Sequence, residues 1–340
     1  MVNCEVEAFY NTGGFFLNKN LKIISVTLLL FLTFITLISY ERIVKPKNII
    51  SEPQTKTENE SIVFSFEHPQ TKQKFKIIKA HKIYQSYIDK VKNIPNNTHL
   101  DIYREEVIKP IYSDCFQNGE FIYMANPILD VVPNIAETQT LIEKINSEDT
   151  DKMIKEALLK SSDLIGSDKE TTVCVLPSTN VNYATMVTVG AGKIIVLYNR
   201  YYSDDVLRAG VAHEYHHSVW TEKYFNENLS FSVLDNLIFE GKAVMFEKLV
   251  YPDIDFTTVD LTYNKDNWLK IAPDLEKYDL NRSLEIIGGG KELPWLYGYS
   301  EGYKMVKSYL DLNPHVTPDE WTALSTKDIF EKGKYLEHYK

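Results

Sequence analysis

The feature that most constrains this chain is the run from Val206 to Trp220, which combines a helical pattern with two histidines four residues apart. No proline interrupts the run. Ser203 in front of it can cap a helix, and the two aspartates that follow Ser203 favour a helix N-terminus. Residues four apart share one helix face, so His213 and His217 can both direct an imidazole nitrogen toward one metal ion. The run therefore predicts a helix that holds a metal on its inward face.

The residue after the first histidine adds a possible catalytic group to the two predicted metal ligands. Glu214 completes the pattern H-E-x-x-H, in which two histidines bind zinc and the glutamate acts as a general base. Its carboxylate can accept a proton from a metal-activated water that attacks a carbonyl, and can pass that proton to the leaving amine. His216 points away from the shared face and is not expected to be a ligand. The alternative interpretation is a polar helix face without any metal.

A catalytic zinc ion needs a third protein ligand and an open fourth position. The continuation H-x-x-G-x-x-H, typical of metzincins, is missing, because Trp220 and Lys223 stand at those places. The next helical run, Ser232 to Val250, carries Glu240 among apolar neighbours, where a carboxylate needs a partner. Glu240 is therefore the expected third ligand. Glu247, seven residues further and near the same face, is the alternative.

Three more residues of this second run are expected to bear on the site. Gly241 lowers helix stability, which predicts a close approach to the metal-bearing helix. Lys242 is expected to add a charge near the metal. Asp235 either orients a ligand imidazole or is a solvated residue of the first helical turn.

The rest of the chain alternates strand and helix patterns and predicts an α+β fold. Two strands of a hairpin are expected at 61–66 and 73–78, and three β-rich runs at 171–176, 184–189 and 193–198 precede the metal-bearing helix. Helices are expected at 80–93, 100–116, 138–145 and 151–165, the second of them broken or kinked at Pro110. One of the last two strands is expected to form the sheet edge to which a peptide substrate adds as a strand.

Three motifs between about residues 145 and 335 carry a resemblance. They are V-A-H-E-Y-H-H, I-F-E-G-K-A and G-Y-S-E-G-Y. The chain resembles a bacterial family of predicted zinc-dependent proteases with a gluzincin-like signature. The resemblance implies a zincin-like metallopeptidase domain with a small sheet, the H-E-x-x-H helix and a glutamate helix. It implies His213, His217 and Glu240 as ligands of one zinc ion per chain and Glu214 as general base.

The third motif opens a helical run that extends to Leu310. Its glycines, Gly298 and Gly302, are four residues apart and permit a close helix contact. A tyrosine hydroxyl near the metal could stabilise the oxyanion that forms when water adds to the scissile carbonyl. Tyr299 is the expected donor. Tyr303 and His315 are alternatives, and a packing role is the third possibility.

The N-terminus predicts a membrane anchor. Ile23 to Ser39 contains no charge, proline or glycine and is close to the shortest length that crosses a bilayer. A cleaved signal peptide is the alternative, but no small-x-small site follows. We expect a flank at 1–22, a transmembrane signal anchor at 23–40, a polar linker at 41–60, an N-terminal α/β region at 61–145 and a zincin-like catalytic domain at 146–340. The protein is then a single-pass protein of the cell membrane with an extracytoplasmic body.

Net charge and cysteine content limit the possible binding partners and covalent links of the chain. The net charge of −10 argues against a nucleic-acid partner, which requires a basic surface. Cys115 and Cys174 either form a disulfide or remain two buried thiols. The sequence predicts a membrane-anchored zinc metallopeptidase with a peptide or protein substrate. The alternative function is a non-hydrolytic, metal-stabilised module that binds peptides or an envelope partner.

Overall fold

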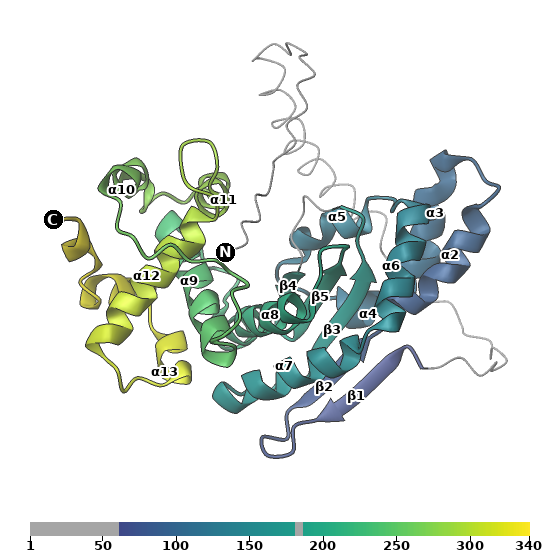
Figure 1. Cartoon of the computed structure of the whole chain (residues 1–340), viewed down its shortest axis with the longest axis horizontal. Helices are drawn as coiled ribbons and strands as arrows, with labels where there is room; N and C mark the ends of the chain where they lie inside the picture. The colour runs from purple at the N-terminus through teal and green to yellow at the C-terminus, as the bar shows by residue number, and fades with distance from the viewer. Residues whose placement is uncertain (1–60, 181–185) are drawn as a thin grey trace, which may run out of the picture. The chain divides into compact units, whose positions relative to one another are not determined.

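A mixed sheet organises the computed structural model, which describes residues 61–340 apart from 181–185 (Figure 1). Its five strands lie in the order β1-β2-β3-β5-β4. Strands β2, β3 and β5 are parallel, whereas β1 and β4 pair antiparallel at the two edges, and the expected β1-β2 hairpin is confirmed. The strands are β1 (Val63–Glu67), β2 (Lys74–Ile78), β3 (Thr171–Pro177), β4 (Met186–Gly190) and β5 (Lys193–Tyr198).

Helices cover both faces of the sheet. Every residue of β3 is buried, and alternate residues enter different cores: Val173 and Val175 pack with α7 and α8, whereas Cys174 and Leu176 pack with the helices before residue 130. The helices that precede β3 are α2 (Tyr84–Val91), α3 (His99–Tyr103), α4 (Lys109–Cys115), α5 (Asn126–Leu129), α6 (Ile135–Ser147) and α7 (Thr150–Leu164).

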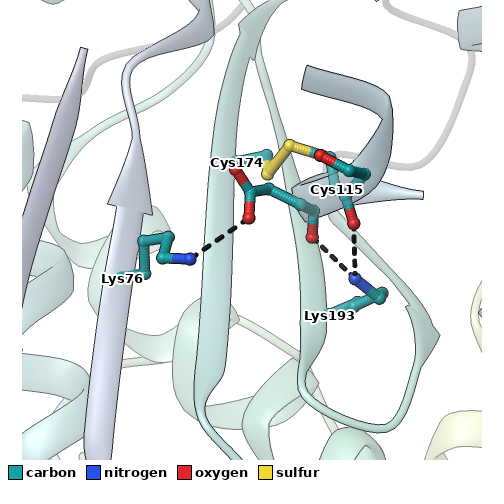
Figure 2. The surroundings of a disulfide bond; sticks show 6 residues. Lys76, Cys115, Cys174 and Lys193 are labelled. Atoms are coloured by element: carbon teal, nitrogen blue, oxygen red, sulfur yellow. Dashed lines mark hydrogen bonds and ion pairs between the residues drawn. A yellow bond between two sulfur atoms is a disulfide. The ribbon is translucent and has the colours of Figure 1, made fainter. Parts of the chain in front are cut away.

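The helix expected at 100–116 is interrupted before Pro110 rather than at it. A π-helical turn, Arg104–Ile108, separates α3 from α4. Pro110 then lies in the first turn of α4, where a residue without an N–H group is tolerated. Figure 2 shows the end of this helix joined to β3 by a disulfide between Cys115 and Cys174. The structure thus selects the disulfide from the two alternatives for these cysteines.

The C-terminal half is helical: α8 (Asp204–Tyr224), α9 (Val233–Val250), α10 (Lys265–Ile271), α11 (Leu280–Gly288), α12 (Tyr297–Leu312) and α13 (Pro318–Ala323). Helices α9 and α12 pack closely through Gly241 and Gly302: a Cβ atom on Gly241 would lie 2.1 Å from the carbonyl carbon of Gly302. The expectation that Gly241 admits the metal-bearing helix was wrong. Its small size serves the contact with α12, as the glycine pair of the third motif predicts.

The remaining short helical segments are η1 (Ala80–Ile83), η2 (Asn96–Thr98), η4 (Ile122–Ala125), η5 (Ala272–Asp274), η6 (Asp328–Lys332) and η7 (Tyr335–Tyr339).

The α+β class is confirmed, with a small mixed sheet. This sheet extends across the boundary expected at residue 145, because β2, which precedes the boundary, pairs with β3, which follows it. The flank, anchor and linker predicted at 1–22, 23–40 and 41–60 lie outside the described residues and stay predictions. Within the described ranges, no helix combines the length and the apolar character that a membrane span requires.

Candidate metal centre

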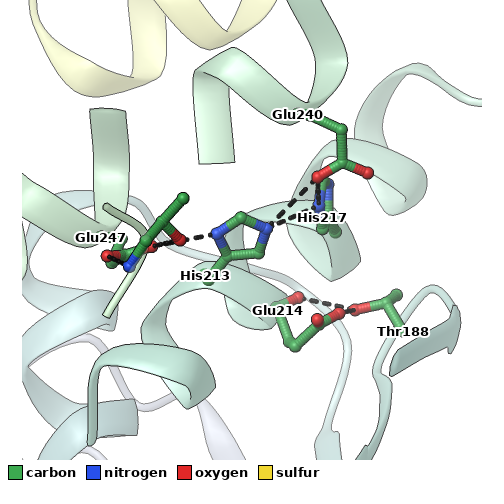
Figure 3. A network of polar contacts seen from close by, with 7 residues as sticks. Thr188, His213, Glu214, His217, Glu240 and Glu247 are labelled. Carbon is green, nitrogen blue, oxygen red and sulfur yellow. Dashed lines mark hydrogen bonds and ion pairs between the residues drawn. The ribbon is translucent and has the colours of Figure 1, made fainter. Parts of the chain in front are cut away.

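Three ligand-type side chains converge between α8 and α9 (Figure 3). The Nε2 atoms of His213 and His217 are 3.2 Å apart, and Oε2 of Glu240 lies 3.4 Å from the first and 3.2 Å from the second. Both helices begin with caps: Ser203 accepts a hydrogen bond from Val206 N, and Ser232 forms a capping box in α9. The caps fix the residue at which each helix begins, and the helical repeat from that residue decides which side chains face inward.

The spacing of these atoms fits a single zinc ion. Tetrahedral coordination with bonds of about 2.0–2.1 Å places ligand atoms about 3.3 Å apart. The three separations of 3.2–3.4 Å agree with this value. Two imidazoles and one carboxylate are also a donor set that zinc accepts in catalytic sites. The ring of Phe239 stacks on that of His217 with centroids 4.1 Å apart, which holds this imidazole in place.

Glu247, the alternative ligand, lies on the other side of His213. Its Oε2 is 3.2 Å from His213 Nδ1, so the imidazole donates there and directs Nε2 toward the convergence point. The side chain of Glu247 is fully buried, and it also accepts hydrogen bonds from the backbone N–H and the hydroxyl of Thr257, at 2.9 and 2.6 Å. Glu247 is thus placed to orient a ligand. Thr257, which sequence reasoning missed, completes its hydrogen bonding.

The electrostatics of the cluster follow from its burial and its carboxylates. Burial opposes a charge on His213, but hydrogen bonds to Glu240 and Glu247 outweigh this effect and raise the pKa of the imidazole to about 10. Burial likewise opposes a charge on Glu240, but the two histidines hold the pKa of its carboxyl well below the usual range. The convergence point therefore favours a cation.

Glu214 leaves α8 on the side that faces the edge strand β4 (Figure 3). The hydroxyl of Thr188 on β4 lies 2.8 Å from the Glu214 carboxylate and 2.8 Å from its backbone oxygen. Glu214 and Thr188 line the same cleft as the two histidines. The edge strand next to the metal-bearing helix is therefore β4, one of the two candidates. Thr188 had no signal in the sequence because its partner is 26 residues away.

Tyr299 also lines this cleft, from the first turn of α12. Its ring centroid is 6.1 Å from that of His213. The carboxylate of Glu240, burial and the carboxylate of Glu214 raise the pKa of Tyr299 well above its usual value, so the hydroxyl stays protonated and can donate a hydrogen bond. Tyr303 and His315 are not among the described residues that line the cleft.

Residues 150–331 match the model of a protein family described as predicted Zn-dependent protease (DUF2268). The chain belongs to this family. The matched segment contains α8, α9 and α12, the three helices that supply the cluster, Glu214 and Tyr299. No curated protein and no solved structure matches the chain. For this member of the family, the details of the site therefore come from its own residues.

Two charged or polar residues near the motifs serve the fold instead of the cluster. The ammonium of Lys242 is buried and donates to the carbonyl oxygens of Thr322 and Leu324, at 2.9 and 2.7 Å, so the expectation of a charge near the metal was wrong. Its hydrogen bonds therefore lie at the end of α13. Asp235 accepts from the backbone N–H and hydroxyl of Ser232 and so caps α9.

His216 lies outside the cluster, as its helical position predicts. It is buried, with Nε2 3.2 Å from the hydroxyl of Thr322 and its ring stacked on Trp321. Burial lowers the pKa of His216 well below its usual value, so this imidazole is neutral.

The cleft above the cluster has a volume of about 470 Å³, within the range of ligand pockets. A larger cavity of about 910 Å³ lies elsewhere and is lined by Lys79, His81 and Asp151 among others. Lys79 and Asp151 pair with each other there at 2.8 Å. The cleft at the cluster is the better candidate for a reaction site because ligand atoms, a carboxylate and a protonated hydroxyl meet in it.

Proposed function

We propose that this protein is a zinc-dependent peptidase that hydrolyses peptide bonds in the cleft beside β4. The observation that carries the proposal is the convergence of His213 Nε2, His217 Nε2 and Glu240 Oε2 at separations suited to one zinc ion, with Glu214 in the same cleft. A purely structural zinc site more often has four Cys and His ligands and does not need Glu214. Membership of a family of predicted zinc-dependent proteases supports the same function.

The three converging side chains would hold the zinc ion, and Glu247 would keep His213 in the tautomer that presents Nε2. When bound, zinc supplies Lewis-acid chemistry, since it polarises a carbonyl and lowers the pKa of a water molecule. The remaining steps belong to side chains of the cleft.

Glu214 is the proposed general base. Its carboxylate takes a proton from the attacking water, whose oxygen adds to the scissile carbonyl carbon. Glu214 then gives the proton to the amide nitrogen as the C–N bond breaks, which yields one carboxylate and one amine. Thr188 restrains the Glu214 side chain by its hydrogen bond. The hydroxyl of Tyr299 donates to the oxygen of the carbonyl, where negative charge develops during addition.

We further propose that residues 23–40 anchor the protein in the cell membrane and that the body is extracytoplasmic. The buried Cys115–Cys174 disulfide supports an oxidising compartment, because disulfides persist there and are rare in the cytosol.

The substitution Glu214→Gln tests the function. We expect kcat on a cleaved peptide to fall at least about 10²–10⁴-fold, because the general base is lost. Zinc content should equal that of the parent, since Glu214 is not a proposed ligand. Glu227→Gln, which changes an exposed glutamate outside the cleft, is the control. Zinc binding without turnover in the parent would favour the non-hydrolytic binding module.

A further inference from the structure

One wall of the cleft is apolar and exposed. Leu280, Leu284 and Ile287 lie along one face of α11 at helical spacings of four and three, and all three line the cleft. Leu280 and Leu284 are 49 % and 48 % exposed, and Tyr278 in front of the helix is 72 % exposed. Exposed apolar side chains that gather at a cleft mark a binding surface. The surface formed by residues 278, 280, 284 and 287 is called the α11 wall below.

Another part of the cleft lining belongs to the sheet. Met186, Val187 and Thr188 of the edge strand β4 line it, together with Phe121 and Tyr123. A peptide that lies in this cleft can therefore reach both the backbone groups of an edge strand and the α11 wall. A peptide side chain that packs against this wall meets leucine, isoleucine and tyrosine.

The charged side chains among the described residues of the cleft offer no evident partner for a chain terminus. No lysine or arginine is among the described residues that line it, and residues 181–185, which precede β4, contain no charged side chain in the sequence. A free C-terminal carboxylate would find no lysine or arginine among the described lining residues to bind. Among the described residues, the carboxylates that line the cleft are Glu214 and Glu240. Both have proposed roles at the metal, so neither is left to hold a free N-terminal amine.

We infer that this protein is an endopeptidase that cleaves internal peptide bonds next to a bulky apolar residue, whose side chain packs against the α11 wall. This inference rests on the proposed peptidase function and adds the position of the cleaved bond and the class of the neighbouring residue. The specificity-determining residues are Leu280 and Leu284, because they are the most exposed of the wall residues that belong to α11.

The first test uses the zinc-loaded full chain and a peptide mixture in which both termini are blocked by acetylation and amidation. We expect cleavage at internal bonds flanked by leucine, phenylalanine, tyrosine or methionine, read by mass spectrometry. Cleavage only of peptides with a free terminus, or at bonds flanked by charged or small residues, would overturn the inference and leave the peptidase function standing. If the zinc-loaded protein cleaves neither blocked nor free peptides, the peptidase function fails and the inference fails with it.

The second test measures binding without turnover. In the Glu214→Gln background, the Kd of a blocked phenylalanine-containing peptide is read by fluorescence anisotropy in Leu284→Arg and in the control Leu269→Arg. Leu269 is 58 % exposed on α10 and does not line the cleft, so both variants add the same charge to a surface leucine. We expect Leu284→Arg to weaken binding about tenfold or more and Leu269→Arg to leave it unchanged. Equal affinities in the two variants would overturn the role of the α11 wall.

Discussion

Glu240 and Glu247 are two carboxylates near the same face of α9, yet their contacts differ. Glu240 approaches the Nε2 atoms of both histidines, whereas Glu247 contacts Nδ1 of His213 alone. Helical spacing identified both glutamates as candidate ligands but could not distinguish between them. They differ in which nitrogen atom of the His213 imidazole each carboxylate contacts. The two histidines and Glu214 were within reach of sequence reasoning because a single helix fixes their relative positions.

The substitution Glu247→Gln tests whether Glu247 orients the His213 imidazole. It keeps the size of the side chain but removes the charge that faces His213 Nδ1. We expect zinc affinity to fall about 10–100-fold, because the imidazole loses the carboxylate that orients it. Competition with a chelator of known affinity measures the change, and Glu227→Gln is the matched control. An unchanged zinc affinity in Glu247→Gln would contradict the orienting role.

At the scale of elements, local patterns predicted where helices begin better than which helices pack together. The starts of α8 and α9 follow from their serine caps and acidic first turns. The packing partner of Gly241 could not be predicted in the same way. A glycine in a helix indicates a close approach of another segment but does not identify that segment. In the structure, the segment that packs against Gly241 is α12. Tyr299 therefore lies on the helix next to the one that carries Glu240.

Gly241→Ala tests the contact between α9 and α12. The added Cβ would meet backbone atoms of Gly302, which cannot move aside as a side chain can. We expect the free energy of unfolding to fall by about 1–3 kcal/mol, measured by urea denaturation. Gly166→Ala is the control: a Cβ there meets nothing within 4 Å, so a change within about 0.5 kcal/mol is expected. Equal effects of the two substitutions would show that α9 and α12 do not pack this closely.

At the scale of the whole molecule, the sequence predicted the strands but not their order. The sheet joins residues 63–78 to residues 171–198, and the core on one of its faces also buries side chains from α8, α9 and α12. Strand pairing across such distances depends on tertiary contacts that no local spacing encodes. The same holds for the disulfide, whose cysteines are 59 residues apart. The helices before residue 130 thus cover one face of a sheet whose strands both precede and follow them in the sequence.

Acid stability of the whole fold should depend on His81, which is buried in η1 and lines the larger cavity. Burial, with a contribution from Lys82, lowers its pKa from 6.5 to about 4. Between these two pH values the unfolded chain binds a proton and the native chain does not. The stability due to neutral His81 is therefore complete above pH 6.5 and is lost as the pH falls toward 4, by about 2–4 kcal/mol.

Denaturant unfolding at several pH values checks this expectation. In His81→Gln, whose side chain keeps a donor for the carbonyl of Val175 but does not titrate, the free energy of unfolding should vary less between pH 6.5 and 4 than in the parent. The control His315→Gln changes an exposed histidine and should retain the parental slope. A parental slope in His81→Gln would show that His81 is not the group responsible.

The zinc content of the purified full chain tests the central claim most directly. We would measure it by elemental mass spectrometry in the parent, in Glu240→Ala and in Glu247→Ala after metal-replete purification. The account predicts about one zinc per chain in the parent, its loss in Glu240→Ala, and weaker but detectable binding in Glu247→Ala. A parent without zinc, or a Glu240→Ala variant that keeps zinc while Glu247→Ala loses it, would contradict the metal centre described above.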